Sequence, residues 1–430
     1  MSRSARDDTV RDDLREPPAV AVVGGGAVGA TVAADLAARG ADVTLYDRGE
    51  LGAESSGRAA GVLYDAYAED VDAALAARAM ERFRAFDRSL PGFEFTPCPY
   101  VIAVREGDPD ADAVPSMVDR MRSHGRDVSV IDLAALADRF PIATDDLAVA
   151  AVAEGAGWCD PASYVAAMGR RARREGVAVE TETAVSVTDN GAELRVHASE
   201  DAAGGGGSRG AVREFDAVVV AAGAHSADVL ADAEIAVPVV PYRVQALTSG
   251  VAYDGPMVYD ATAGVYLRPH PTGLLAGDGT EPVAADPDEY DREGDEWFVD
   301  SVSKTLRERV DAVGDGGSDD EAPSVERAWA GLCTATPDGD PLVGPVGGER
   351  PDRGGDADRL FVATGWQGHG FMRAPAVGEL VAEGVLASLD GTDADAPESP
   401  WIGPFDPDRF DGDEAFEITE GMSVEARVGE

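Results

Sequence analysis

The sequence has almost no lysine and a large shortage of basic residues overall. Only one of its 36 basic residues is a lysine, Lys304, and they stand against 81 acidic residues, so the net charge is −45. Self-repulsion at this charge density weakens in molar salt, where the Debye length falls to about 3 Å. The composition therefore favours a salt-adapted acidic protein, and a chain this negative should bind neither nucleic acid nor anionic membranes.

The scarcity of cysteine, histidine and long apolar runs argues against a disulfide-stabilised, a metal-binding or a membrane-inserted protein. The three cysteines, Cys98, Cys159 and Cys333, form no C-x-x-C motif, so we expect no disulfide framework. The five histidines include no pair at helical ligand spacing, and we predict no metal site. No apolar run approaches about 20 residues and the charged N-terminus has no apolar signal segment. We therefore expect a cytoplasmic location without membrane insertion.

A glycine-rich turn separates two apolar segments near the N-terminus. Residues 19–23 (AVAVV) are typical of a buried parallel strand, and three glycines follow them. Residues 27–39 are typical of a helix, and residues 42–46 (DVTLY) of a second strand. This order predicts a dinucleotide-binding unit.

Four residues of this unit have distinct expected roles. Gly24 allows the tight turn, and Gly26 allows the backbone to approach a diphosphate at the helix N-terminus. Gly29 allows the helix to pack on the strand, while Asp47 accepts hydrogen bonds from ribose hydroxyls. The same carboxylate would repel a 2′-phosphate, which argues against NADP. The fingerprint by itself does not separate FAD from NAD.

The remaining periodicity predicts further helices and strands. Helices are expected over 70–90, 161–175 and 374–389, and strands over 177–188, 192–197, 216–222, 239–248, 257–268, 273–277 and 360–364. The strands between 239 and 277 do not alternate with helices. They therefore predict a separate, mostly antiparallel layer beside the α/β part.

Several ordered motifs extend from the first strand to the last helix. They are 55–61 (SSGRAAG), 157–161 (GWCDP), 221–226 (AAGAHS), 266–269 (YLRP), 329–332 (WAGL), 336–339 (TPDG), 365–371 (GWQGHGF) and 375–379 (PAVGE). Together they resemble the FAD-dependent amine and amino-acid oxidoreductases, a family that includes D-amino-acid oxidase, glycine oxidase, sarcosine oxidase and dimethylglycine dehydrogenase. The resemblance implies a Rossmann-like FAD-binding domain with an inserted, mostly antiparallel β-rich substrate domain.

The resemblance also implies which residues bind the cofactor. They are Gly24, Gly26, Ala27, Val28, Gly29, Asp47, Arg48, Ser55, Ser56, Arg58, Ala59, Ala60, Gly61, Val185, Ala222, Gly223, Gly331, Gly365, Gln367, Gly368, His369, Gly370, Phe371 and Met372. Members that attach the flavin through a cysteine in this region would align it nearer Gly331 than Cys333. We therefore predict non-covalent FAD.

The second glycine turn, 365–370, has a physical role that does not depend on the family. It opens a helix, so backbone N–H groups near Gly368 and Gly370 face outward with the helix dipole behind them. A flavin gains negative charge when it accepts a hydride, and such donors stabilise that charge. His369 either contacts the flavin or is a core histidine, and a role as catalytic base is a third possibility.

Two positions depart from the family pattern. Cys333 stands where some members carry the arginine that binds a substrate carboxylate, and Met372 stands where sarcosine-oxidase-like members carry a lysine. We interpret Cys333 first as a small apolar pocket residue and second as a reactive thiol. The candidates for an alternative cation are Arg58, Arg243, Arg268 and Arg373, of which Arg373 is better explained by a surface ion pair. The tyrosines that either bind substrate or pack are Tyr64, Tyr242 and Tyr266. No catalytic residue is assigned, and the candidates are Arg58, Tyr266, Arg268 and His369.

The expected division of the chain follows from these motifs. The FAD-binding domain comprises 17–93, 155–235 and 325–390, the substrate domain comprises 94–154 and 236–324, and acidic extensions cover 1–16 and 391–430.

The resemblance implies oxidation of a C–N bond in an amino acid or an N-methylated amine. Hydride would pass to the flavin and leave an imine. The lack of lysine near the motifs favours a dehydrogenase over an oxidase. Such a dehydrogenase passes its electrons to another carrier, such as an electron-acceptor protein. The alternatives are an FAD- or NAD-linked 2-hydroxy-acid dehydrogenase and a flavin-binding subunit of a larger dehydrogenase complex.

Overall fold

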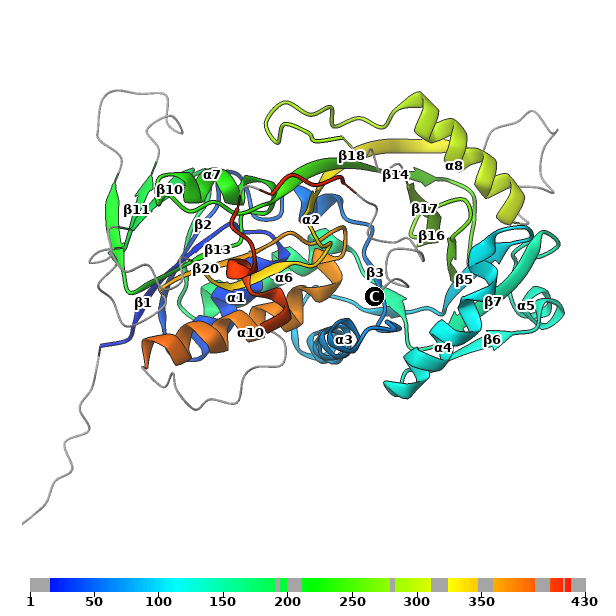
Figure 1. Ribbon diagram of the computed structural model, residues 1–430, viewed down its shortest axis with the longest axis horizontal. Coiled ribbons are helices and arrows are strands. Elements are labelled where there is room, and N and C mark those ends of the chain that lie inside the picture. Colours follow the sequence, from blue (N-terminus) through cyan, green and yellow to red (C-terminus); the bar gives the residue numbers. More distant parts are fainter. Residues whose placement is uncertain are drawn as a thin grey trace, which may run out of the picture.

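The computed structural model describes residues 16–189, 194–198, 211–278, 283–310, 324–346, 359–390, 403–412 and 414–418. These residues form a six-stranded sheet, an eight-stranded sheet and two three-stranded sheets. Figure 1 shows the two large sheets towards opposite ends of the elongated molecule, with the long strands β14 and β18 of the eight-stranded sheet running along its top. The acidic extensions 1–16 and 391–430 lie mostly outside the described residues.

The six-stranded sheet has the order β19-β20-β13-β1-β2-β9. Its strands are β1 (Ala19–Val23), β2 (Asp42–Tyr46), β9 (Ala178–Glu180), β13 (Ala217–Val220), β19 (Leu342–Pro345) and β20 (Leu360–Thr364). All pairs are parallel except β19 with β20. β1 and β13 are apolar along their whole length and buried, as strands covered on both faces must be.

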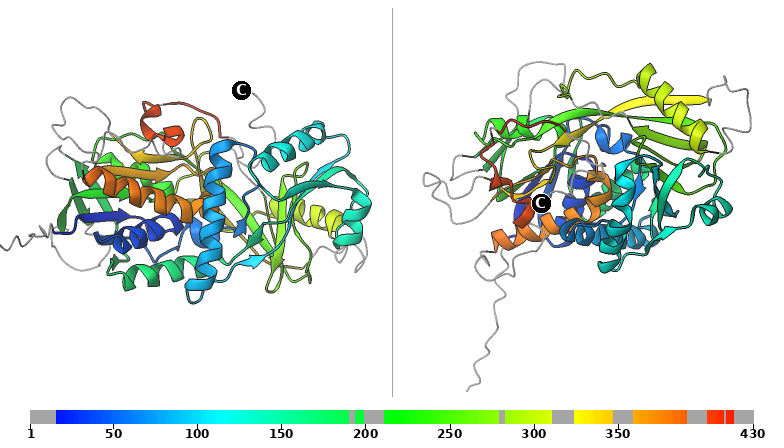
Figure 2. Two further views of the ribbon diagram at one scale, coloured as in Figure 1. Left: turned by 90° about the horizontal axis from the view of Figure 1, so that it is seen from below. Right: turned by 45° about the vertical axis from the view of Figure 1, so that its right-hand side comes forward.

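Helices cover one face of this sheet and a small sheet covers the other. On the first face lie α1 (Ala27–Ala38), α3 (Asp70–Ser89), α6 (Pro161–Arg174) and α10 (Gly370–Leu389), which share one apolar core with β1 and β2. On the second face lie β10 (Val185–Asp189), β11 (Leu194–Ala198), β12 (Val212–Phe215) and α7 (Ser226–Ala231). The left view of Figure 2 shows α3 standing across the middle of the molecule, between the helices of the first face and the second large sheet.

The eight-stranded sheet is mostly antiparallel. Its strands, in spatial order, are β18 (Val325–Ala335), β14 (Val240–Ser249), β17 (Gly273–Asp278), β16 (Val265–His270), β15 (Met257–Asp260), β5 (Tyr100–Arg105), β7 (Leu147–Ala153) and β6 (Val128–Ile131). Only the pair β15 and β5 is parallel. Three further helices pack on this part, α4 (Val114–Ser123), α5 (Leu133–Arg139) and α8 (Glu296–Arg309). The fold class expected from the sequence is confirmed.

Most predicted elements are present, and two strand predictions are wrong in detail. Residues 177–188 are not one strand, because the chain turns at Glu182, which has φ of 52°, and β9 and β10 enter different sheets. Residues 257–268 are a hairpin whose turn contains Gly264 with φ of 66°. The last helix begins at Gly370, four residues before the predicted start, so its first turn lies inside the glycine motif.

The division into domains stays a proposal, with one difference in the assignment of strands. β18 was assigned to the FAD-binding part, but it pairs with β14 along ten positions in the eight-stranded sheet. Short elements connect the two large sheets: α2 (Ser55–Arg58) precedes a small sheet of β3 (Val62–Leu63), β8 (Gly157–Trp158) and β4 (Thr96–Pro97). Among the described residues, none of the helices combines the length and the apolarity that a bilayer crossing requires.

Candidate functional site

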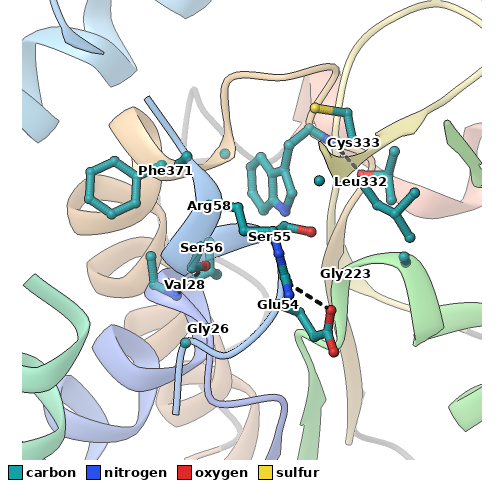
Figure 3. Close-up of a pocket in the computed structure, with 18 of the residues that line it drawn as sticks. Gly26, Val28, Glu54, Ser55, Ser56, Arg58, Gly223, Leu332, Cys333 and Phe371 are labelled. Atoms are coloured by element: carbon teal, nitrogen blue, oxygen red, sulfur yellow. Dashed lines mark hydrogen bonds and ion pairs between the residues drawn. The ribbon is translucent and has the colours of Figure 1, made fainter. Parts of the chain in front are cut away.

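A cavity of about 510 Å³ lies between the two large sheets. It is lined from the six-stranded side by the glycine turn after β1 and by the start of α10, and from the eight-stranded side by β14, β16 and β18. Its volume is in the range of cofactor sites, about 300–1,000 Å³. Figure 3 shows the N-terminal part of α1, the segment around Ser55 to Arg58, and Phe371 at the start of α10 meeting around it.

The first glycine turn forms one end of the cavity. Gly24 has φ of 105°, and a Cβ there would lie 2.4 Å from the carbonyl oxygen of Ala221. A Cβ at Gly29 would lie 1.9 Å from the carbonyl oxygen of Gly24, so helix and strand can pack only with glycine at this position. Gly24 and Gly26 line the cavity, whereas Gly29 is behind the turn and does not.

Asp47 follows β2 and lines the same end of the cavity. Its Oδ2 accepts the N–H of Gly25 at 2.6 Å and its Oδ1 accepts that of Gly49 at 2.8 Å. Burial raises the pKa of Asp47, and these two backbone hydrogen bonds oppose that rise. A carboxylate oxygen has more than one acceptor site, so Asp47 can still accept ribose hydroxyls.

The segment 55–61 forms the middle of the cavity wall. Ser56 Oγ accepts the N–H of Ala27 at 2.9 Å, which ties α2 to the N-terminus of α1. Gly61 has φ of 70°, and a Cβ there would lie 2.1 Å from the carbonyl oxygen of Cys159. The backbone of this segment is therefore held tightly against its neighbours, with its cavity side formed by small residues.

The turn 365–370 forms the opposite end. It includes Gly365 and Gly368 with φ of 77° and 85°, and Gln367 with φ of 47°, a conformation that costs a non-glycine residue about 1–3 kcal/mol. Thr334 holds the turn, because its Oγ1 accepts the N–H of Trp366 at 3.1 Å and its carbonyl oxygen accepts that of Gln367 at 2.9 Å. Residues 366–372 line the cavity, whereas Gly365 does not. The N-terminus of the 20-residue helix α10 therefore points at the cavity.

His369 and Met372 contact the same tyrosine behind this turn. His369 is 5% exposed, lines the cavity, and its ring lies edge-on to that of Tyr67 at 5.9 Å. Met372 Sδ accepts the hydroxyl of Tyr67 at 2.9 Å. The place of His369 in the wall fits contact with a cofactor, and the role of catalytic base stays a proposal.

Three of the four candidate arginines do not line the cavity, and two of these lie away from it. Arg243 donates to Asp295 at 2.5 Å and to the carbonyl oxygens of residues 291 and 293, and it is not part of the lining. Arg373 is not the surface ion pair predicted from the sequence, because it is 1% exposed and forms a buried ion pair with Asp72 at 2.6 Å. The helical position of Arg373 turns it away from the cavity and towards α3.

The other two arginines lie at the segment 55–61. Arg58 lines the cavity, but its Nη1 donates to Glu54 at 3.1 Å, the ion pair drawn in Figure 3. Arg268 lies behind the wall and donates from Nε to the carbonyl oxygen of Ala60 at 2.5 Å. In both residues the guanidinium is therefore hydrogen-bonded to protein groups of the wall, Glu54 for Arg58 and the Ala60 carbonyl oxygen for Arg268.

Aromatic side chains form the cavity wall beside the segment 55–61, where the Arg58 carbonyl oxygen accepts the Nε1–H of Trp329 at 3.1 Å. The rings of Tyr64 and Tyr100 lie 5.0 Å apart, and Tyr242, Tyr266 and Trp329 complete this wall. Beside them stands Cys333, whose thiol pKa burial raises to about 12, so it is protonated at neutral pH. Sequence reasoning missed Tyr100, Trp329 and several apolar residues, because no local pattern shows which strand faces a cavity. For Trp329 there was a signal, because it is the first residue of the motif 329–332.

Charged residues gather where the cavity meets Asp47. Arg48 donates to Asp288 at 2.6 Å and lies 3.1 Å from Nε2 of His225. Burial, and after it the charge of Arg48, lower the pKa of His225. Val185, Ala222 and Gly223 line this end as predicted, whereas the contribution of Asp288 was not predicted. Within the described part of the chain, no group of acidic, histidine and cysteine side chains is arranged to bind a metal.

These observations fit an elongated dinucleotide. Two helix N-termini face the two ends of one cavity, and backbone N–H groups there suit a diphosphate and an electron-rich ring. A Cβ at Gly26 would meet only Ser56, so the backbone at this point is open towards the cavity. Of the predicted cofactor residues, the structure brings together all except Gly29 and Gly365, which shape the turns from behind.

Comparisons with known proteins agree with this geometry. A family model described as FAD dependent oxidoreductase matches residues 19–384. The chain is 25% identical over 399 residues to a glycine oxidase of Pseudomonas putida, which covers 89% of this chain and 98% of that one. It is also 29% identical over 315 residues to an anaerobic glycerol-3-phosphate dehydrogenase subunit A1 of Haloferax volcanii. That match covers 70% of this chain and spans about half (52%) of the relative's length.

Solved structures share the fold. The crystal structure of L-proline dehydrogenase from P. horikoshii matches with a TM-score of 0.77 and 24% identity, covering 92% of this chain and 98% of that one. The glycine oxidase of Geobacillus kaustophilus matches with a TM-score of 0.75 and 21% identity, covering 92% and 100%.

Proposed function

We propose that this chain, which belongs to the family of FAD-dependent oxidoreductases, oxidises the C–N bond of an amino acid or an N-methylated amine. The cofactor is FAD, and we propose that it is bound without a covalent link. The observation that carries the proposal is the single cavity with a glycine turn and a helix N-terminus at each end. The similarity to glycine oxidases over most of both chains supports the choice of a C–N bond.

Bound FAD supplies a two-electron acceptor for a hydride from the carbon next to nitrogen. As the C–H bond breaks, the nitrogen lone pair forms the C=N bond, and the N–H proton leaves to water. Water then adds to the imine and releases a carbonyl compound and an amine. The chain's part is to bind the amine as the free base, orient it and exclude bulk water.

The residues fit these tasks. The N–H groups at the start of α10 would stabilise negative charge on the cofactor, as preorganised donors do for an oxyanion. The wall of Tyr64, Tyr100 and Tyr266 offers aromatic faces and hydroxyl groups to the substrate.

The electron acceptor is proposed to be another carrier and not dioxygen. A lysine ammonium in the cavity lining would help dioxygen accept an electron, because superoxide is an anion, whereas Arg268 lies behind the wall. The single lysine, Lys304, is on α8, is 71% exposed and lies 3.8 Å from Glu308, away from the cavity lining. Measured oxygen uptake with peroxide release during turnover would overturn this part of the proposal alone.

The test is an anaerobic substrate screen. The purified chain, loaded with FAD in molar salt, is mixed with amino acids, N-methylated amines, 2-hydroxy acids and glycerol 3-phosphate, and loss of flavin absorbance is followed. We expect bleaching by an amine. Bleaching only by a hydroxy acid or by glycerol 3-phosphate would favour oxidation of a C–O bond, a possibility raised by the similarity to the Haloferax volcanii subunit. No bleaching by any of them would favour a subunit that needs partners.

A further inference from the structure

Among the residues that the structure describes, one buried arginine differs from the other buried arginines in having no carboxylate partner. Among the described residues, five arginines are less than 9% exposed. Four of them have a carboxylate within ion-pair distance: Arg82 with Asp35 at 2.7 Å, Arg243 with Asp295 at 2.5 Å, Arg309 with Asp260 at 2.8 Å and Arg373 with Asp72 at 2.6 Å. The fifth, Arg268, forms no ion pair with any residue that the structure describes.

Arg268 is held instead by main-chain oxygens and an aromatic ring. Its Nε donates to the carbonyl oxygen of Ala60 at 2.5 Å and its Nη1 to that of Pro269 at 2.7 Å. Its Cζ lies 4.7 Å from the centre of the Trp158 ring. The side chain is 3% exposed, and burial lowers its pKa to about 10, so it remains charged at neutral pH.

The surroundings do not neutralise this charge. Cys98, Cys159 and Tyr266 are the uncharged titratable groups near it, and Asp160 and His270 are the titratable groups towards the surface. Asp160 is exposed, caps α6 by accepting the N–H of Ser163, and forms no ion pair with Arg268. A buried charge without a counter-ion destabilises a protein. The buried charge of Arg268 therefore has to be explained by function and not by stability.

The charge lies directly behind the wall of the cavity. Ala60, the acceptor of its hydrogen bond, lines the cavity, and so does Tyr266, two residues before Arg268 on the same strand. Residues two apart in a strand point to the same face, so Arg268 and Tyr266 share the face that meets the segment 55–61. A positive charge at this place makes the potential in the cavity more positive, and molar salt screens it little because it is buried.

We infer that Arg268 is a positioning residue that acts through Ala60: it fixes the cavity wall and its uncompensated positive charge favours the reduced, more negative flavin. The inference rests on the cofactor and not on which substrate is oxidised. It concerns the flavin's reduction potential, which is measured without any substrate. If the substrate screen fails but the flavin potential falls in the Arg268 variant, the proposed function is contradicted and the inference about Arg268 is still supported.

The first experiment compares two variants that separate charge from hydrogen bonding. Arg268→Lys keeps the charge, whereas Arg268→Gln keeps a donor for Ala60 but removes the charge. The midpoint potential of the bound FAD is measured against reference dyes in molar salt, with sulfite affinity as a second readout, because sulfite adds an electron pair to the flavin as a hydride does. For Arg268→Gln we expect a tenfold smaller equilibrium constant for two-electron reduction, which is a fall of about 30 mV. For Arg268→Lys we expect a change of less than threefold.

Two results would overturn the inference. One is an unchanged potential in Arg268→Gln, and the other is an equal fall in both variants, which would mean that the guanidinium acts only as a structural clamp.

A second pair of variants leaves Arg268 in place, in case its replacement prevents folding. Cys98 lies near enough for the charge of Arg268 to lower its thiol pKa, although burial raises that pKa more. Cys98→Asp would give the guanidinium a carboxylate partner, and Cys98→Ser is the matched neutral control. We expect the potential to fall in Cys98→Asp relative to Cys98→Ser. Equal potentials in these two variants would contradict the inference.

Discussion

Replacing Asp72 by alanine should lower the free energy of unfolding by about 3 kcal/mol. Asp72 and Arg373 are 2% and 1% exposed, and their ion pair joins α3 to the first turns of α10 at 2.6 Å. Removal of one partner from such a pair costs about 3–5 kcal/mol, because the other charge stays buried. The Tyr67 ring, 5.4 Å from the Arg373 guanidinium, retains part of the compensation, which favours the lower end of that range.

A double variant tests whether the loss of stability comes from the charge that is left unpaired. Replacing both residues by leucine removes both charges, and replacement of a buried pair by apolar residues is often neutral. We therefore expect Asp72→Leu/Arg373→Leu to recover at least about 2 kcal/mol relative to Asp72→Ala. The matched control is Glu214→Ala at an exposed pair, where Arg195 and Glu214 side chains are 36% and 63% exposed and the loss should be below about 1 kcal/mol.

Urea unfolding in molar salt measures these differences. Tryptophan and flavin fluorescence are followed with and without excess FAD, since bound cofactor adds its own stabilisation. The reasoning is refuted if Asp72→Ala loses no more stability than Glu214→Ala, or if the double variant unfolds as readily as Asp72→Ala.

Three further predictions follow from the same structure. Gly24→Ala should weaken FAD binding at least tenfold in a fluorescence titration, because its Cβ would lie 2.4 Å from a main-chain oxygen, whereas Gly107→Ala, also at positive φ but with open space around it, should not. Gly378→Val should destabilise the protein by about 1–3 kcal/mol or more in urea, since its Cβ would lie 2.4 Å from a side chain of α1 where α1 and α10 cross. Burial raises the pKa of all three thiols, to about 12 for Cys333, against about 8.5 in an unfolded chain, so none should react with a thiol reagent at pH 8 until urea is added. The contribution of the protonated thiols to the free energy of unfolding is then fully present below about pH 8.5 and is lost as the pH rises towards 12. Rapid reaction of Cys333 with the reagent in the folded protein would contradict the raised pKa.

The parts of the structure that could be predicted from the sequence are those built from near neighbours. β1, α1 and β2 lie at the expected residues, because the apolar runs and the glycines between them are local signals. The start of α6 is local in the same way, since Asp160 accepts the N–H of Ser163 and Pro161 follows it in the first turn. In each case the physical cause is within a few residues of its effect.

The remaining features depend on contacts between distant segments. The parallel pairing of β5 with β15 joins residues more than 150 positions apart, and no periodicity reports it. The burial of Arg373 depends on Asp72, about 300 residues away, so the sequence near Arg373 offered only a surface ion pair as its explanation. Likewise the faces of β14 and β18 that line the cavity were not distinguishable until their partners were known.

Arg268 lacks a carboxylate partner in a protein that is rich in carboxylates. A chain with 81 acidic residues has carboxylates available for nearly any cation, and four of the five buried arginines in the described residues use one. The exception, Arg268, lies behind the cavity wall and donates to the carbonyl oxygen of Ala60. The exposed Asp160 nearby accepts the N–H of Ser163 at the start of α6. In molar salt, surface charges have little reach, so only a buried charge can set the potential of a bound flavin. We therefore expect that, in this acidic protein, the field at the cofactor comes from the two helix N-termini and Arg268, and that changes of surface charge leave the flavin potential nearly unchanged.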